Sequence, residues 1–206
     1  MESLEIKPIK KKKITLYLIR NKKQELDKNQ LHNLHNILEN EKFRFAIIDF
    51  NDKQLKESYE KPLARFLDKF WIPYFSVDIP DYVRDLLNVE IFEKEALINE
   101  LETEYENLCF KGDERDSFKM QSLNSWIELL KKEVESQKAS LESSIKPKWI
   151  VKKVLDIAKM IRNDVFSIVH FTQEEIYSEL KNLFESNNIK VKKIDISKYN
   201  VNKIMA

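Results

Sequence analysis

The chain has 206 residues, a length that suits one α/β domain with an insertion, and 34% of them are charged with nearly balanced signs. This balance argues against a strong global field, so a nucleic-acid partner is possible but not favoured. The only glycine, Gly112, argues against a P-loop, a dinucleotide-binding loop and a nucleophile elbow in their usual forms, because these motifs rely on several glycines.

Cysteine content and hydropathy give expectations about where in the cell the protein is located. The single cysteine, Cys109, has no internal disulfide partner and fits a reducing, cytoplasmic setting. No apolar run approaches membrane-spanning length, so we expect no membrane partner. Residues 1–13 form a basic leader that is too polar for a secretory signal, and residues 198–206 form a tail.

Residues 14–82 predict the first half of an α/β body. Apolar runs at 14–20 and 43–50 are typical of buried strands, and a helix with one apolar face is expected over 30–40. A further helix over 52–70 has to kink or break at Pro62. In the stretch 72–82, a third strand ends at Asp78 and Pro80 stands where the next helix begins.

Residues 83–146 predict a helical arm. Apolar residues alternate at spacings of three and four on two successive segments, which indicates an antiparallel coiled-coil hairpin with Gly112 in its turn. The second helix is expected to end near Lys146, before Pro147. The seam comprises Leu87, Ile91, Ile98, Leu101, Tyr105 and Leu108, then Leu123, Ile127, Leu130, Val134 and Leu141.

Residues 147–197 predict the second half of the body: a helix over 148–161, strands over 165–170 and 189–196, and a helix between them. Thr172 and Glu175 have the spacing of a capping box for that helix. Asn40, and Asn187 or Asn188, stand where helices usually end with a left-handed residue.

The two halves resemble each other. A shift of 146 residues superposes Leu34, Asn36, Glu39, Ile48 and Asp49 on Leu180, Asn182, Glu185, Ile194 and Asp195. This likeness predicts an α/β fold with a Rossmann-like, doubly wound, mainly parallel sheet of about five strands, into which the coiled-coil hairpin is inserted. Common packing constraints could produce the same likeness without duplication.

Polar residues cluster after the predicted strands, where ligands bind in open α/β sheets. Two interpretations are open. Paired aspartates could bind Mg²⁺ for work on a phosphate ester or nucleic acid, with Arg20 on the phosphate. Alternatively, Asp52, Asp81 and Thr172 cap helices, and no metal binds; we favour this second interpretation. The catalytic candidates are Asp49, Asp52, Asp78, Asp81 and His170, and the ligand-binding candidates are Arg20, Asn21 and Thr172.

Two function classes follow. The favoured one is a non-enzymatic cytoplasmic interaction or regulatory module whose arm binds a protein partner or a second copy; the alternative is the Mg²⁺-dependent enzyme. Trp71, Trp126 and Trp149 are expected in the core or at the arm base, although Trp126 flanks the seam and could face a partner.

Overall fold

The computed structural model describes residues 6, 9, 12–21, 28–49, 62–110, 118–194 and 196. The chain divides into two compact units. One unit, Asp81–Glu142, is called the hairpin unit below; the other, Met1–Pro80 with Ser143–Ala206, is called the body.

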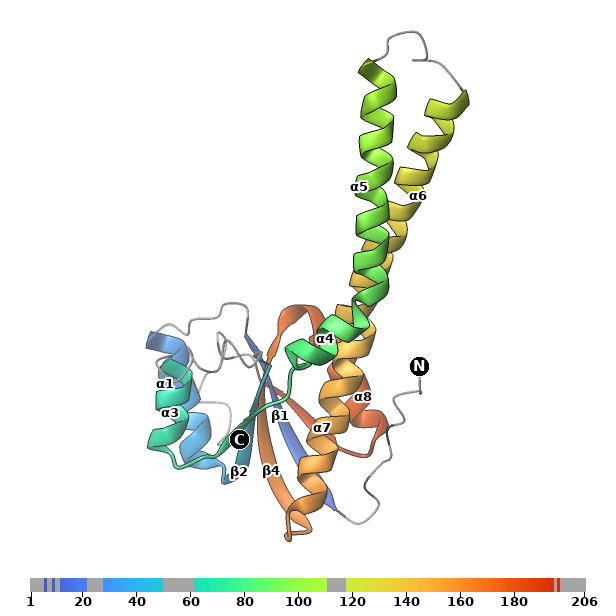
Figure 1. Cartoon of the computed structure of the whole chain (residues 1–206). Coiled ribbons are helices and arrows are strands. Elements are labelled where there is room, and N and C mark those ends of the chain that lie inside the picture. The colour runs from blue at the N-terminus through green and yellow to red at the C-terminus, as the bar shows by residue number, and fades with distance from the viewer. Residues whose placement is uncertain are drawn as a thin grey trace. The chain divides into compact units, whose positions relative to one another are not determined.

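The body is built on one five-stranded sheet in which every paired strand is parallel to its neighbours (Figure 1). The α/β class and the parallel sheet of five strands are therefore confirmed. The strand order, β3-β2-β4-β1-β5, differs from the order along the chain. The strands are β1 (Lys13–Asn21), β2 (Phe43–Ile48), β3 (Tyr74–Ser76), β4 (Val165–Gln173) and β5 (Lys190–Ile194).

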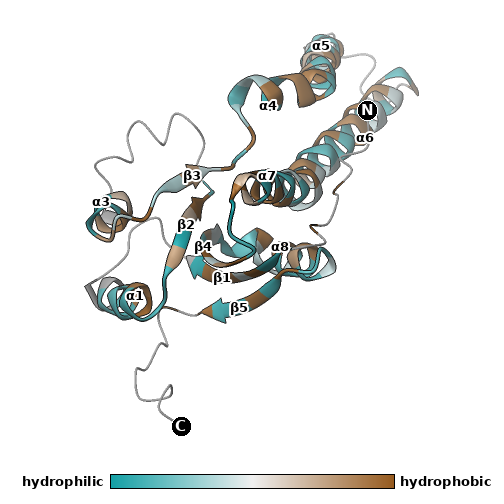
Figure 2. Ribbon diagram, turned by 90° about the horizontal axis from the view of Figure 1, so that it is seen from below, coloured by the Kyte–Doolittle hydropathy of each residue, from teal (hydrophilic) through white to brown (hydrophobic). Residues whose placement is uncertain are grey.

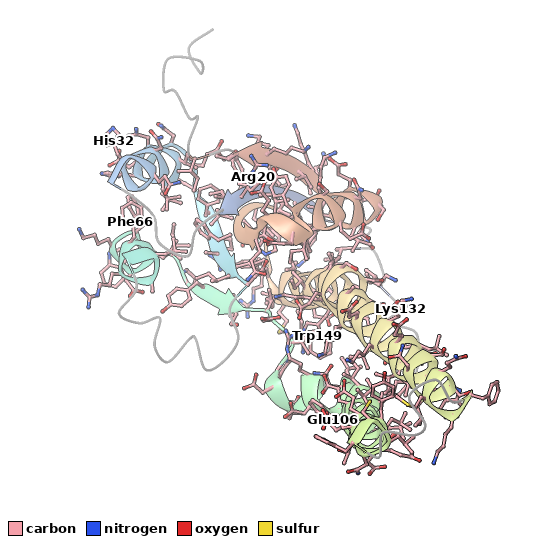
Figure 3. The ribbon with its side chains drawn as sticks, turned by 90° about the horizontal axis from the view of Figure 1, so that it is seen from above. Arg20, His32, Phe66, Glu106, Lys132 and Trp149 are labelled. Carbon is pink, nitrogen blue, oxygen red and sulfur yellow. The ribbon has the colours of Figure 1, made fainter. Side chains whose placement is uncertain are left out.

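Helices cover both faces of this sheet. One face packs on α1 (Lys28–Asn40) and α3 (Pro62–Lys69), and the other on α7 (Lys146–Met160) and α8 (Glu174–Ser186) (Figure 2). Neighbouring residues of β4 serve opposite faces: Ile168 joins the α7/α8 core, whereas Val169 joins the α1/α3 core. His32 and Phe66 in Figure 3 mark the adjacent helices α1 and α3. Because both faces are covered, the central strands are apolar on both sides.

The two β-α-β segments that resemble each other in sequence also have similar topology. The connection from β1 through α1 to β2 passes over β4, and the connection from β4 through α8 to β5 passes over β1. Leu34 and Leu180, which the shift superposes, are both fully buried, and Ile48 and Ile194 are buried as well. Similar connections thus impose similar burial patterns on the two segments.

The ends of α8 and α1 differ. Asn188 follows α8 with φ of 63°, and the Ile189 amide donates to the Phe184 carbonyl at 3.1 Å, so the prediction of a left-handed asparagine after this helix is confirmed. The same prediction for Asn40 is wrong. Asn40 is the last residue of α1 and has no positive φ.

Two predictions about helix boundaries, one at a start and one at an end, are also wrong. Glu174 begins α8 and Gln173 is its cap residue, without a side-chain cap bond, so Thr172 remains in β4 and forms no capping box with Glu175. The expected helix break before Pro147 is absent: a π-helical segment η1 (Leu141–Ile145) leads directly into α7. Pro147 is the second residue of α7, directly after the π-helical segment, where the regular α-helical hydrogen-bond pattern is already interrupted.

The hairpin unit contains α4 (Asp81–Leu87), α5 (Val89–Phe110) and α6 (Phe118–Ser140), and Pro80 directly precedes α4 as expected. Helices α5 and α6 lie side by side around a small core of Ile91, Ile98, Ile127 and Val134. Gly112 and the predicted turn lie outside the described residues. Among the helices that the structure describes, none combines the length and apolar character needed to cross a bilayer.

Candidate functional site

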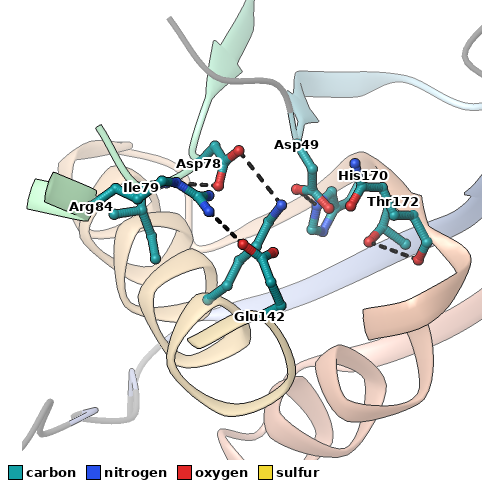
Figure 4. Close-up of polar contacts among 9 residues, drawn as sticks. Asp49, Asp78, Ile79, Arg84, Glu142, His170 and Thr172 are labelled. Atoms are coloured by element: carbon teal, nitrogen blue, oxygen red, sulfur yellow. Dashed lines mark hydrogen bonds and ion pairs between the residues drawn. The ribbon is translucent and has the colours of Figure 1, made fainter. Parts of the chain in front are cut away.

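Buried polar side chains gather at one edge of the sheet. Strands β3, β2 and β4 are parallel neighbours, so their carboxyl ends lie at the same edge. Asp49 follows β2, Asp78 follows β3, and His170 and Thr172 lie near the end of β4 (Figure 4). Of the five described residues that are both polar and buried, Asp49, His170 and Thr172 are at this edge, which we call the carboxyl edge.

His170 and Asp49 form a buried pair. The His170 Nε2 atom lies 2.6 Å from Asp49 Oδ1, and the two side chains are 0% and 2% exposed. The imidazole also stands edge-on to the ring of Phe184 in α8, with centroids 6.0 Å apart. Within the described part of the chain, His170 Nδ1 and Asp49 Oδ2 are buried without a hydrogen-bond partner. Buried polar atoms are seldom left unpaired, so these two atoms mark the pair as unusual.

This pair has the form of a carboxylate that orients an imidazole, an arrangement used in general-base catalysis. Catalysis also requires that the free nitrogen reach a substrate. The ring of His170 is fully buried, so Nδ1 has no access to solvent in this conformation. As it stands, the pair satisfies one polar atom of each residue and fixes the ends of β2 and β4 together.

Asp78 forms a second buried pair with Lys146, which the sequence analysis missed. Lys146 Nζ lies 3.5 Å from Asp78 Oδ2, and the side chains are 5% and 7% exposed. Asp78 Oδ1 also accepts a hydrogen bond of 2.8 Å from the Ile79 amide. A sequence signal existed: Lys146 lies four residues before Ile150 and eight before Val154, on the apolar stripe of α7.

The other predicted site residues are placed as follows. Arg20 (labelled in Figure 3) forms a 3.0 Å ion pair with Glu174, the first residue of α8, where the helix dipole favours a carboxylate. Thr172 is buried, and among the described residues its hydroxyl makes only a long contact of 3.5 Å with the Gln173 carbonyl. Asp52 and the side chain of Asn21 lie outside the described residues, and Asp81 begins α4 in the hairpin unit.

The described residues contain no group of three or more His, Cys, Asp or Glu side chains positioned to hold a metal ion. Asp49 and Asp78 each have a nitrogen-bearing side chain beside them instead. The carboxyl edge therefore shows two separate buried pairs.

The hairpin unit has a patterned surface. Along one edge of the α5/α6 pair, Lys94 contacts both Glu90 and Glu133 at 3.0 Å, and further along Lys119 contacts Glu104 at 2.8 Å. Hydrogen bonds donated by Lys94 lower the pKa of Glu90, and the same ammonium's hydrogen bonds to Glu133 and Glu90 raise the pKa of Lys94. The opposite edge carries the pairs Glu95–Lys138 and Glu102–Lys131.

Between the ion pairs of the first edge lie apolar side chains. Leu97 precedes Glu104 by seven residues, and Trp126 follows Lys119 by seven, so the antiparallel register places Leu97 and Trp126 at the same edge. Leu129 lies one helical turn from Trp126. The three side chains are 38%, 62% and 57% exposed and form what we call the Trp126 patch.

Formal charge is divided unequally between the two units. Residues 81–142 contain 16 Asp or Glu and 8 Lys or Arg, a formal charge of −8. The rest of the chain contains 28 Lys or Arg and 19 Asp or Glu, a formal charge of +9. The overall neutrality seen in the composition thus hides an acidic hairpin and a basic body.

Comparisons with protein-family models, with curated proteins and with solved structures give no match to this chain.

Proposed function

We propose that the chain is a non-enzymatic interaction module, in which a Rossmann-like body presents the α5/α6 hairpin as a coiled-coil arm to a protein partner. The observation that carries this proposal is the Trp126 patch. Trp126 is 62% exposed although it lies beside the apolar seam between α5 and α6. Exposed tryptophans surrounded by polar residues are typical of energetically dominant interface positions.

The hairpin core does not account for this tryptophan. Four buried members of the seam, Ile91, Ile98, Ile127 and Val134, form a core cluster that does not include Trp126. The flanking ion pairs, Lys94–Glu133 and Lys119–Glu104, already connect the two helices. A partner that covers Trp126, Leu97 and Leu129 would remove apolar surface from water while these ion pairs form a polar rim.

Charge indicates the chemistry of the partner. Helix α5 carries seven glutamates and one lysine, so the surface beside the patch is strongly acidic. The complementary surface is an apolar ridge flanked by lysine or arginine side chains. A second copy of the arm is disfavoured as the partner, because two units of charge −8 repel each other.

A site-specific cross-linker tests the proposal. Full-length protein with p-benzoylphenylalanine in place of Trp126 should capture a protein in cells, while the same group in place of Phe92, also exposed but on another side of α5, should not. The captured protein is then purified, and its affinity for Trp126→Ala should be at least about tenfold weaker than for wild type or Phe92→Ala.

The outcomes separate the alternatives. Equal loss of affinity in both alanine variants, or none in either, would place the interface away from the Trp126 patch. Self-association in analytical ultracentrifugation that Trp126→Ala abolishes would identify a second copy as the occupant and overturn the charge argument.

A second candidate function is a metal-dependent hydrolase acting on a phosphate ester or nucleic acid, using the acidic strand ends. The unpaired Oδ2 of Asp49 and Nδ1 of His170 favour it, because both atoms could accept a new partner after a rearrangement. Calorimetric titration with Mg²⁺ or Mn²⁺ tests it. Saturable heat that disappears in Asp49→Asn and Asp78→Asn would support the enzyme over the interaction module.

A further inference from the structure

A pocket in the body opens at the edge of the sheet opposite the carboxyl edge. Its volume is about 820 Å³, and it lies among the residues that begin β2 and β3 and those between α7 and β4. Its lining includes Phe43, Arg44, Trp71, Phe75, Met160 and Arg162, and we call it the Trp71 pocket. All of its lining residues belong to the body.

Trp71 is held in an unfavourable backbone conformation. It follows α3 with φ of 54°, and the Ile72 amide donates to the Leu67 carbonyl at 3.1 Å, which is the helix ending that normally uses glycine. Bulky residues in this conformation are genuine outliers. Its side chain is 92% exposed, so the expectation that Trp71 is a core residue is wrong. Neither backbone geometry nor packing explains a tryptophan here, and such outliers point to a functional role.

Arg44 lines the pocket at a second backbone irregularity, in the pairing of β2 with β4. The pairing of β2 with β4 advances two residues on β2, from Phe43 to Phe45, against one residue on β4, from Ser167 to Ile168. Arg44 is therefore the extra residue of a β-bulge, a feature that redirects side chains and is enriched beside functional sites.

The pocket carries positive charge on an aromatic surface. The side chains of Arg44 and Arg162 are exposed, and neither has a polar partner in the part of the chain that the structure describes. None of the described residues that line the pocket is acidic. Phe75 is half-exposed and rests edge-on against the buried ring of Phe45, with centroids 5.5 Å apart, so its position is fixed by the core.

We infer that the Trp71 pocket binds a nucleotide, whose base stacks on Trp71 while Arg44 and Arg162 bind its phosphate. Aromatic rings bind bases of any sequence by stacking, and arginine forks match phosphate oxygens. The volume is within the usual range for small-ligand sites. The body carries a formal charge of +9, so the near-zero net charge of the whole chain does not argue against binding of a polyanion by the body. The ligand chemistry is shared by a free mononucleotide and by a single strand of nucleic acid.

Fluorescence anisotropy of full-length protein with a labelled oligothymidylate of about ten nucleotides tests the inference, with dTMP and AMP as competitors. Trp71→Gly should weaken binding about tenfold through lost stacking, without lowering the melting temperature, because glycine suits this backbone position. Trp71→Asn, which also tolerates the left-handed conformation, should weaken binding to a similar extent.

The arginines are tested by salt titration. Arg44→Gln and Arg162→Gln should each lower the slope of log affinity against log salt by about 1. Arg65→Gln is the matched control, because this exposed arginine of α3 carries the same charge but does not line the pocket, and its slope should stay close to that of wild type.

Competition identifies the source of the ligand. Mononucleotides that compete at concentrations close to those of the oligonucleotide indicate a free nucleotide, whereas competition by oligonucleotide alone indicates a single strand. Binding that is unchanged in both Trp71 variants, equal displacement by polyglutamate, or no binding even at low salt would overturn the inference.

Discussion

The buried His170–Asp49 pair gives the sharpest test of the carboxyl edge. Both side chains are inaccessible to solvent, and their hydrogen bond of 2.6 Å is the one polar contact that either makes among the described residues. His170→Phe keeps an aromatic ring beside Phe184 but leaves the Asp49 carboxylate buried without a partner. Breaking a buried pair in this way costs about 3–5 kcal/mol. For a protein of this size, that cost lowers the melting temperature by about 6–20 °C.

Asp49→Leu should also destabilise, because it leaves the imidazole without its acceptor, at a cost of about 1–3 kcal/mol for a neutral histidine. The double variant Asp49→Leu/His170→Phe replaces both polar groups with apolar ones and should recover most of the stability. Guanidinium unfolding followed by circular dichroism measures all four proteins and yields the coupling energy. If each single variant lost less than about 1 kcal/mol of unfolding free energy and the two losses were additive in the double variant, the buried interaction between His170 and Asp49 would be refuted.

Three further predictions concern other parts of the chain. Replacing residues 88–140 with a short flexible linker should leave a body that unfolds cooperatively, since the hairpin unit is a compact unit of its own; a molten remainder would show that the body needs it. Trp71→Gly should raise the free energy of unfolding by up to about 1 kcal/mol, because glycine adopts the left-handed backbone conformation without strain. Asn188→Gly should give a smaller gain, because asparagine already tolerates that conformation. A loss of stability in Trp71→Gly would mean that the Trp71 side chain packs against the protein in solution. The lowered pKa of Glu90 predicts a contribution to stability that is lost as the pH falls below the ordinary glutamate value of 4.5. The raised pKa of Lys94 predicts a contribution that is lost as the pH rises above the ordinary lysine value of 10.5. Unfolding curves measured across pH should lose both of these dependences in Lys94→Met.

The sequence alone identified the order of the elements, because that order depends on local periodicity. Buried parallel strands are continuous apolar runs, and amphipathic helices repeat every three to four residues, so β1, β4 and the α5/α6 seam were readable from residue spacing. Helix ends were less readable. Asn188 adopts the expected left-handed conformation, but Trp71 does so without any local sequence preference for it.

The candidate site was readable in part. Asp49, Asp78, His170 and Thr172 were predicted from the rule that polar residues after parallel strands share one edge of the sheet. Their partners were not predicted. Lys146 is 68 residues from Asp78 along the chain, and His170 is 121 from Asp49, so no local pattern links them.

Only the tertiary structure decided the strand order and the contacts that depend on it. Because β4 inserts between β2 and β1, His170 lies beside Asp49, and Arg44 becomes the unpaired residue of a bulge. The division into two units likewise separates a charge of −8 from one of +9, which nearly cancel in the composition. Local propensity acts over a few residues, whereas strand pairing and burial bring together residues more than a hundred positions apart, so the sequence determined the elements and the packing of those elements determined the sites.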